Sequence, residues 1–174
     1  MTIADPRPTR TDLIRTLTRV ERVFVIPVCT DGQLLLLRHE IARHAYWTFP
    51  TMARPLPRTH LTPLAHRLTR EKLGIEPSQL RLVAIFEPTR AHGRAAVYTA
   101  ALPATGAQII TNHAGGPARR HPLQAMTFTA DTINALDIRP AEVTALLATG
   151  GDPARNASLL PDLVDAATTS PHNR

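Results

Sequence analysis

The sequence is poor in the residues that mark secreted, membrane and base-stacking proteins. It has one cysteine and one tryptophan, its only lysine is Lys72, and aromatic residues make up 4% of the chain. A single cysteine excludes an intramolecular disulfide and favours a reducing compartment. No apolar run approaches the roughly 18 residues that cross a bilayer. The polar opening, MTIADPRPTRTD, lacks the apolar stretch of a secretory signal. We therefore expect a cytoplasmic protein with no membrane partner.

The positive charge of the chain raises the question of a nucleic-acid partner. The formal net charge is +6 at pH 7, and such an excess is typical of proteins that bind phosphate backbones. Against that interpretation, the arginines are scattered along the chain and few aromatic residues are present to stack on bases. Cys29 lies among valine, isoleucine and proline, so we expect a buried, inert thiol and not a nucleophile.

The chain has the length of one ordinary domain, and its pattern predicts strands, a helix, more strands and a last helix. Asp31-Gly32 is a strong hairpin signal. Thr62-Pro63 and Gly74 predict the start and the end of a helix. Residues 50–62 and 112–123 are expected to be loops. The expected strands are 21–30, 33–40, 45–49, 80–87, 94–102, 107–111 and 125–129, and the expected helices are 11–20, 62–73 and 139–150.

This order of elements predicts an α+β or α/β sandwich with a mixed sheet between helices. The run of four leucines in residues 33–40 is typical of a strand that is buried on both faces. We expect an N-terminal segment with a short helix at 1–21, of which 1–10 are disordered. One domain follows at 22–150, and a partly disordered tail at 151–174.

Residues 46–75, YWTFPTMARPLPRTHLTPLAHRLTREKLGI, resemble the Nudix box, whose pattern is G-x5-E-x7-R-E-U-x-E-E-x-G-U with U bulky and apolar. Gly74-Ile75 match its closing pair, Arg67 its arginine and Glu71 one of its clustered glutamates. The other signature positions differ: Ala53 and Thr59 replace the early glycine and glutamate, and Leu68 and Lys72 replace the other two clustered glutamates. The resemblance covers about residues 22–149 and implies an α/β/α sandwich with a mixed central sheet.

Members of that family use the clustered glutamates to hold metal ions that polarise a diphosphate and activate water. Mg²⁺ needs oxygen ligands, commonly one or two carboxylates plus phosphate. With only Glu71 left beside Lys72, we expect the usual magnesium-dependent hydrolysis to be lost or impaired, and we predict no cofactor. If any residue of this helix holds a metal, it is Glu71. An ion pair between Glu71 and Arg67 on the helix surface is the competing interpretation.

Other residues could bind or act on a ligand. His60 and His66 are candidates for acid–base chemistry together with Glu71, although scattered histidines are usually solvated. Four histidines flank the box (His39, His44, His60 and His66), but their spacing does not match a metal site. Trp47 could stack on a planar ligand or pack in the core beneath the helix. The candidate ligand-binding residues are Arg67, Trp47, Glu87, Arg90, His113, Arg119, Arg120 and His121.

The basic loop before the last predicted strand favours a site that does not depend on a metal. No carboxylate occurs between Glu87 and Asp131, and Arg119, Arg120 and His121 lie there instead. Guanidinium groups bind phosphate or carboxylate bidentately without a metal. The competing interpretation is a solvated basic loop.

Three hypotheses for the function follow. The first is a divergent protein of this fold that binds an anionic or nucleotide-like small molecule, as a sensor or as a repurposed enzyme. The second is an active Mg²⁺-dependent diphosphate hydrolase with non-standard ligands, such as Glu71, Glu87 and Glu40. The third is an interaction or nucleic-acid-binding module. A homodimer is compatible with all three.

Overall fold

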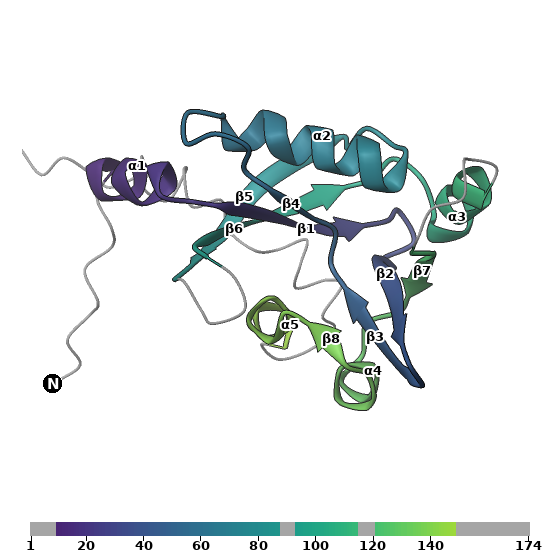
Figure 1. The fold of residues 1–174 in the computed structure, drawn as a ribbon. Coiled ribbons are helices and arrows are strands. Elements are labelled where there is room, and N and C mark those ends of the chain that lie inside the picture. Colours follow the sequence, from purple (N-terminus) through teal and green to yellow (C-terminus); the bar gives the residue numbers. More distant parts are fainter. Residues whose placement is uncertain (1–9, 88–92, 115–120, 149–174) are drawn as a thin grey trace, which may run out of the picture.

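The computed structural model describes residues 10–87, 93–114 and 121–148. A mixed sheet of eight strands lies between helices (Figure 1). No helix in these ranges has both the length and the apolar character needed to cross a bilayer. The helices are α1 (Arg10–Thr18), α2 (Leu61–Leu73), α3 (Gly106–Ala114), α4 (Ala130–Ala135) and α5 (Ala141–Leu147). The strands are β1 (Arg22–Val28), β2 (Leu34–Ile41), β3 (His44–Thr48), β4 (Thr51–Ala53), β5 (Gln79–Phe86), β6 (Ala95–Ala101), β7 (Leu123–Met126) and β8 (Ile138–Arg139).

Strand β1 lies at the centre of the sheet, whose order is β5-β6-β1-β2-β3-β8, with β4 paired to β1 and β7 to β2. β1 runs parallel to β6 along its whole length. Its other edge pairs antiparallel with β4 at its start and with β2 only at its end, where Val28 faces Leu34. Because β1 changes neighbour along this edge, the sheet divides into one half around β5, β6 and β4 and another around β2, β3, β7 and β8.

Two apolar layers form the core, one on each face of the sheet. Along β1, Val23 and Val25 face the layer under α2, whereas Phe24 and Ile26 face the layer that includes α5. This alternation follows from the two-residue period of a strand. Figure 1 shows α2 above the sheet and α5 below it. The predicted run of leucines in β2 is indeed buried on both faces, because Leu35 joins the first layer while Leu34 and Leu36 join the second.

The helix predicted from Thr62-Pro63 and Gly74 has its N-cap two residues earlier than expected. α2 starts at Leu61, and His60 is its N-cap residue, without a side-chain hydrogen bond to the helix. Thr62, expected to be the cap, lies in the first turn, and its hydroxyl is 3.2 Å from that of Tyr98. The predicted end is confirmed, because Gly74 has φ of 72° and its N–H donates to the carbonyl of Arg70. The predicted loop 50–62 also contains the short strand β4.

The strand predicted at residues 107–111 is wrong, because these residues lie in helix α3. The apolar pair Ile109-Ile110 favoured a strand, but a cap fixes the helix. The N–H of Gln108 donates to Oγ1 of Thr105 over 3.3 Å, and the N–H of Thr105 donates to Oε1 of Gln108 over 2.9 Å. This reciprocal arrangement is a capping box, with threonine and glutamine three residues apart. Residues 112–114 of the predicted loop belong to the same helix.

The last predicted strand is displaced, and it is not the last. β7 ends at Met126, so the residues after it do not continue the predicted strand 125–129. Thr129 instead caps the short helix α4, because its Oγ1 accepts the N–H of Thr132 over 3.2 Å. Strand β8 then pairs parallel with β3. The predicted final helix is confirmed as α5, with Pro140 at its N-cap. The predicted tail at 151–174 lies outside the described residues.

The environment of Cys29 matches the expected buried thiol. Its side chain is buried in the layer under α2. Burial, and secondarily the charge of Asp31, raises the pKa of the thiol to about 12. Since the thiolate is the nucleophilic form, an almost fully protonated thiol is inert at neutral pH.

Candidate functional site

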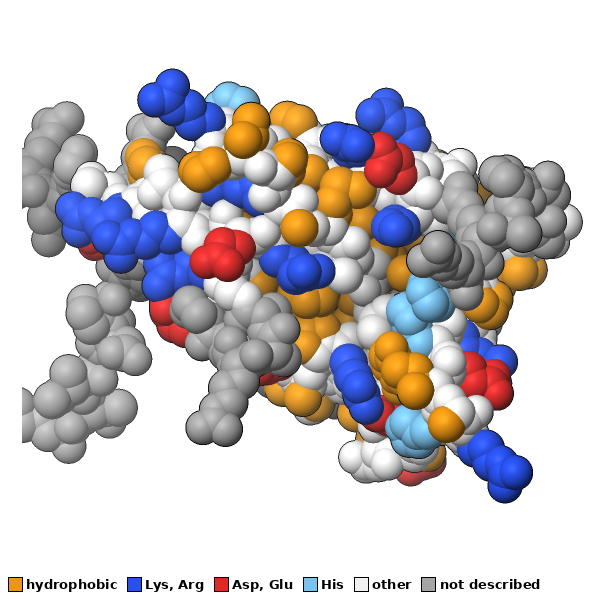
Figure 2. Space-filling model, in the orientation of Figure 1, with side chains coloured by type: hydrophobic (Ala, Val, Ile, Leu, Met, Phe, Trp, Pro, Cys, Tyr) orange, Lys and Arg blue, Asp and Glu red, His pale blue; other side chains and the backbone are white. Residues whose placement is uncertain are grey.

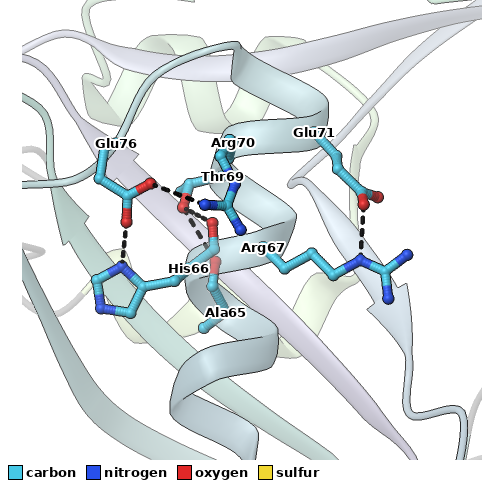
Figure 3. A network of polar contacts seen from close by, with 7 residues as sticks. All are labelled: Ala65, His66, Arg67, Thr69, Arg70, Glu71 and Glu76. Atoms are coloured by element: carbon cyan, nitrogen blue, oxygen red, sulfur yellow. Dashed lines mark hydrogen bonds and ion pairs between the residues drawn. The ribbon is translucent and has the colours of Figure 1, made fainter.

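Helix α2 places the signature positions of the box in different environments. Leu68 is fully buried in the layer under the helix, whereas Lys72 is exposed. Glu71 is also exposed, and its Oε1 accepts a hydrogen bond from Nε of Arg67 over 2.6 Å (Figure 3). The predicted ion pair one turn apart on the helix therefore forms. Leucine offers no donor atom and lysine is a cation, so these positions of α2 do not fit a magnesium ion.

The two histidines proposed for acid–base chemistry lie apart from Glu71. His60 is exposed at the start of α2. Nδ1 of His66 is 2.7 Å from Oε1 of Glu76, just beyond the end of the helix. Figure 3 shows His66 and Glu76 on one flank of α2 and the pair of Arg67 and Glu71 on the opposite flank. The structure does not bring the three proposed catalytic residues together.

The carboxylates proposed as non-standard metal ligands are also separated. Glu71 pairs with Arg67 on α2, Glu40 with Arg38 on β2, and Glu87 with Arg94 at the ends of β5 and β6. Within the described ranges, no group of three or more His, Cys, Asp or Glu side chains could hold a metal ion. The four histidines that flank the box form no such group either.

A column of stacked side chains crosses the part of the sheet that contains β2, β3 and β8. We call it the ring column: His121, His39, Tyr46 and Arg139. The ring centroids of His121 and His39 are 3.9 Å apart, and those of His39 and Tyr46 are 4.8 Å apart with nearly parallel planes. The guanidinium carbon of Arg139 lies 4.4 Å from the Tyr46 centroid.

Strand register explains how the ring column forms. His39 faces Tyr46 across the β2–β3 pair, and Thr48 faces Arg139 across the β3–β8 pair. The side chain of His39 is on the same face of the sheet as that of Leu35, four residues earlier. Helix α2 packs on this face where the face is formed by β1. In Figure 2, histidine and apolar side chains lie together at the lower right, over β2 and β3. The column is therefore on a part of the sheet that leaves its side chains accessible.

Only His121 in the ring column was a predicted ligand residue. His39, Tyr46 and Arg139 were not predicted to bind a ligand, although His39 was considered as a metal ligand. The contact between His39 and Tyr46 could have been predicted from the short turn between β2 and β3, because residues equally distant from such a turn face each other. Arg139 could not be found in this way, because β8 lies more than 90 residues away from the turn and its pairing is not local.

Charged neighbours fix the electrostatics of the ring column. Hydrogen bonds from Arg139 and then from His44 lower the pKa of the Asp137 carboxyl to about 2. The same carboxylate raises the pKa of Arg139. Burial, and secondarily the nearby His121, lowers the pKa of His39. We therefore expect a neutral His39 ring at neutral pH, 2.8 Å from the hydroxyl of Thr48.

The Asp137 carboxyl should titrate near pH 2. Because its pKa is lowered in the folded state, the stability it contributes is present above its unfolded-state pKa and is lost as pH falls through about 2. Carboxyl carbon shifts followed by NMR from pH 5 downwards would measure this pKa. In an Arg139→Gln variant it should rise towards the ordinary value. An unchanged pKa would contradict the assignment of the shift to Arg139.

The remaining predicted ligand residues do not form one site. Trp47 packs against the core layer opposite α2, and its indole N–H donates to Oε1 of Gln124 over 2.8 Å. Trp47 therefore packs in the core, as one of the two interpretations predicted, but on the face of the sheet opposite α2. Glu87 is paired with Arg94, and His113 is half-buried in the last turn of α3. Arg90, Arg119 and Arg120 lie outside the described residues.

Comparison with solved structures identifies the fold. No protein-family model matches the chain, and no curated protein is similar to it in sequence. Its structure is similar to a Nudix hydrolase from Nitrosomonas europaea, with a TM-score of 0.57, 14% identity and coverage of 85% of this chain and 94% of that one. A MutT structure, from work on Aliivibrio salmonicida and Vibrio cholerae, gives a TM-score of 0.52, 13% identity and coverage of 76% and 98%.

An ADP compounds hydrolase gives a TM-score of 0.51 at 16% identity, with coverage of 72% of this chain and 67% of that one. These likenesses agree with the α/β/α sandwich and the mixed sheet that the resemblance of residues 46–75 implies. The chain has the Nudix hydrolase fold.

Proposed function

We propose that this protein binds an anionic, nucleotide-like small molecule without magnesium-dependent hydrolysis, as a sensor or as an enzyme repurposed for other chemistry. The ring column is the observation that carries the proposal. An exposed imidazole at the end of a stack of rings presents a flat surface to a planar group. A nucleobase that continues such a stack gains about 1–3 kcal/mol.

The charge around the ring column suits an anionic ligand. Arg139 lies at one end of the stack, where two hydrogen bonds to Asp137 hold the guanidinium in place and offset its charge, which leaves its Nη1 for a ligand. His121 forms the other end, and Arg119 and Arg120, which lie outside the described residues, directly precede it in the sequence. Guanidinium groups bind phosphate oxygens in pairs of parallel hydrogen bonds, so such a ligand needs no bridging metal.

The residues of α2 support the absence of magnesium chemistry. At the positions where the family pattern has three clustered glutamates, the chain has a buried leucine, an exposed lysine and Glu71, which is paired with Arg67. A single paired carboxylate offers a divalent cation too few oxygens to replace its water shell. We therefore assign no step to a metal ion.

Calorimetric titration with nucleoside diphosphates and diphosphate sugars, with and without EDTA, tests the proposal. We expect binding that EDTA leaves unchanged. His121→Ala should weaken binding about tenfold, the equivalent of about 1.4 kcal/mol of lost stacking. Ile14→Ala is the matched control, because it truncates an exposed apolar side chain on α1, far from the ring column. Binding abolished by EDTA, or magnesium-dependent release of phosphate, would refute the proposal.

A further inference from the structure

A cavity of about 720 Å³ lies where α1 ends and β1 and β4 pair. Four of its lining residues are arginines: Arg19, Arg22, Arg54 and Arg94. Glu21 is the one carboxylate among them, so four positive charges and one negative charge leave a formal excess of +3 on the lining. In Figure 2, cationic side chains gather at the left, over α1 and the start of β1. Neither α2 nor the ring column contributes a residue to this cavity.

Internal contacts hold two of these guanidinium groups in place. Arg54 donates from Nη1 to three carbonyl oxygens at the end of α1, each over 3.1 Å, and from Nε to the carbonyl of Thr59. The side chain of Arg94 is only 16% exposed and pairs with the largely solvated Glu87. Among the described residues, Nε of Arg94 is one of the few buried polar atoms without a hydrogen-bond partner. The cavity wall therefore carries the fixed positive charge of Arg54, whereas Glu87 offsets the charge of Arg94.

The other two arginines are freer to turn towards a ligand. Arg19 is exposed at the cavity mouth. Arg22 is half-buried, and its Nη1 donates a long hydrogen bond, of 3.4 Å, to Oγ1 of Thr51. A guanidinium with a weak protein contact can exchange that contact for an oxyanion at little cost.

Gly93 lies directly beside the carboxylate of Glu21. A Cβ on residue 93 would lie 1.9 Å from Oε2 of Glu21. The backbone of Glu21 is also fixed, because its N–H donates to the carbonyl of Arg94 and its carbonyl accepts the N–H of Arg54. The one negative charge of the lining thus sits among the arginines, where it lowers the attraction for any anion.

We propose that this cavity is a second binding site, for a small multivalent oxyanion bearing phosphate or carboxylate groups. Guanidinium groups recognise both groups through the same planar, bidentate geometry. With Arg94 offset by Glu87, the other three arginines and Glu21 leave an excess of +2, which two negative charges on the ligand match. A volume of this size admits a small molecule with several oxyanion groups.

Calorimetry with two probes, inorganic diphosphate and citrate, tests this site in a metal-free buffer of low ionic strength. Wild-type protein binds at least one probe, and the tighter of the two identifies the ligand as a phosphate or a carboxylate. Arg22→Gln weakens binding about fivefold or more, because a charge-assisted hydrogen bond is lost. Glu21→Gln has the opposite effect, strengthening binding about threefold, because it removes the repulsive charge.

The control is Arg43→Gln, which makes the same change in net charge at an exposed position in the turn between β2 and β3. The affinity of the Arg43→Gln variant for the tighter-binding probe stays within twofold of the wild-type affinity. Circular dichroism establishes that each variant is folded, and the opposite sign for Glu21→Gln separates a site effect from misfolding. No binding of either probe by the wild type overturns the proposal. So does equal weakening by Arg22→Gln and Arg43→Gln, or weaker binding by Glu21→Gln.

Discussion

Replacing Leu68 by glutamate, which restores a carboxylate of the family pattern, is expected to destabilise the protein by about 4 kcal/mol or more and not to create a metal ligand. The side chain of Leu68 is fully buried in the layer between α2 and the sheet. Glutamate there loses the packing of an apolar side chain and places a carboxyl group where no partner has been built for it. Urea unfolding at pH 7 would measure the loss.

The pH dependence of that loss identifies its cause. Burial raises the pKa of a carboxyl group, so the folded state of the variant holds a proton that the unfolded chain releases. The Leu68→Glu variant should therefore be least destabilised at about pH 4. Its stability should fall by up to about 1.4 kcal/mol per unit as pH rises above the unfolded-state pKa. Wild type, measured over the same range, provides the baseline.

Two further variants separate packing from charge in this prediction. Leu68→Ala removes the side chain without adding a charge and should cost about 3 kcal/mol at every pH in this range. Lys72→Glu restores the other missing carboxylate at an exposed position, so it should change stability by about 0.5 kcal/mol. If Leu68→Glu were as stable as wild type and gained stability with magnesium, the packing role of Leu68 would be wrong.

Much of the fold could be predicted because its signals are local. The hairpin at Asp31-Gly32, the run of leucines in β2 and the end of α2 at Gly74 are each specified within a few residues. Short elements were missed because their reasons are not local. β8 is only two residues long and exists because it pairs with β3, and β4 exists because it pairs with β1. Neither has enough residues for a periodic pattern.

The candidate site was harder to predict than the fold. The resemblance drew attention to α2, where it correctly located the pair of Arg67 and Glu71. The ring column instead depends on Tyr46, which is at no signature position of the box, and on Arg139 from a distant strand. The arginine-lined cavity joins residues from α1, β1, β4 and the start of β6. Spacing along one element does not reveal such a combination, because pairing between strands brings the residues together.

Arg54 should contribute more to stability than any other exposed or half-buried arginine whose contacts are described. Its guanidinium caps the carbonyl end of α1 through the oxygens of Leu17, Thr18 and Val20. The carbonyl of Leu17 also accepts the N–H of Val20. The last carbonyls of a helix have no partner within it, and a cation near them also offsets the helix dipole. Since several charge-assisted hydrogen bonds are lost together, we expect Arg54→Ala to reduce the free energy of unfolding by about 2–3 kcal/mol.

The loss of stability in the Arg54→Ala variant should be concentrated in α1. Amide hydrogen exchange in α1 should accelerate more than exchange in α5, because the cap holds α1 against the start of β1, whereas α5 packs on the opposite face of the sheet. Arg58→Ala is the matched control, since Arg58 is an exposed arginine in the same loop, and it should change stability by about 0.5 kcal/mol or less. Equal losses for the two variants would mean that the charge of the loop, and not the cap on α1, accounts for the effect.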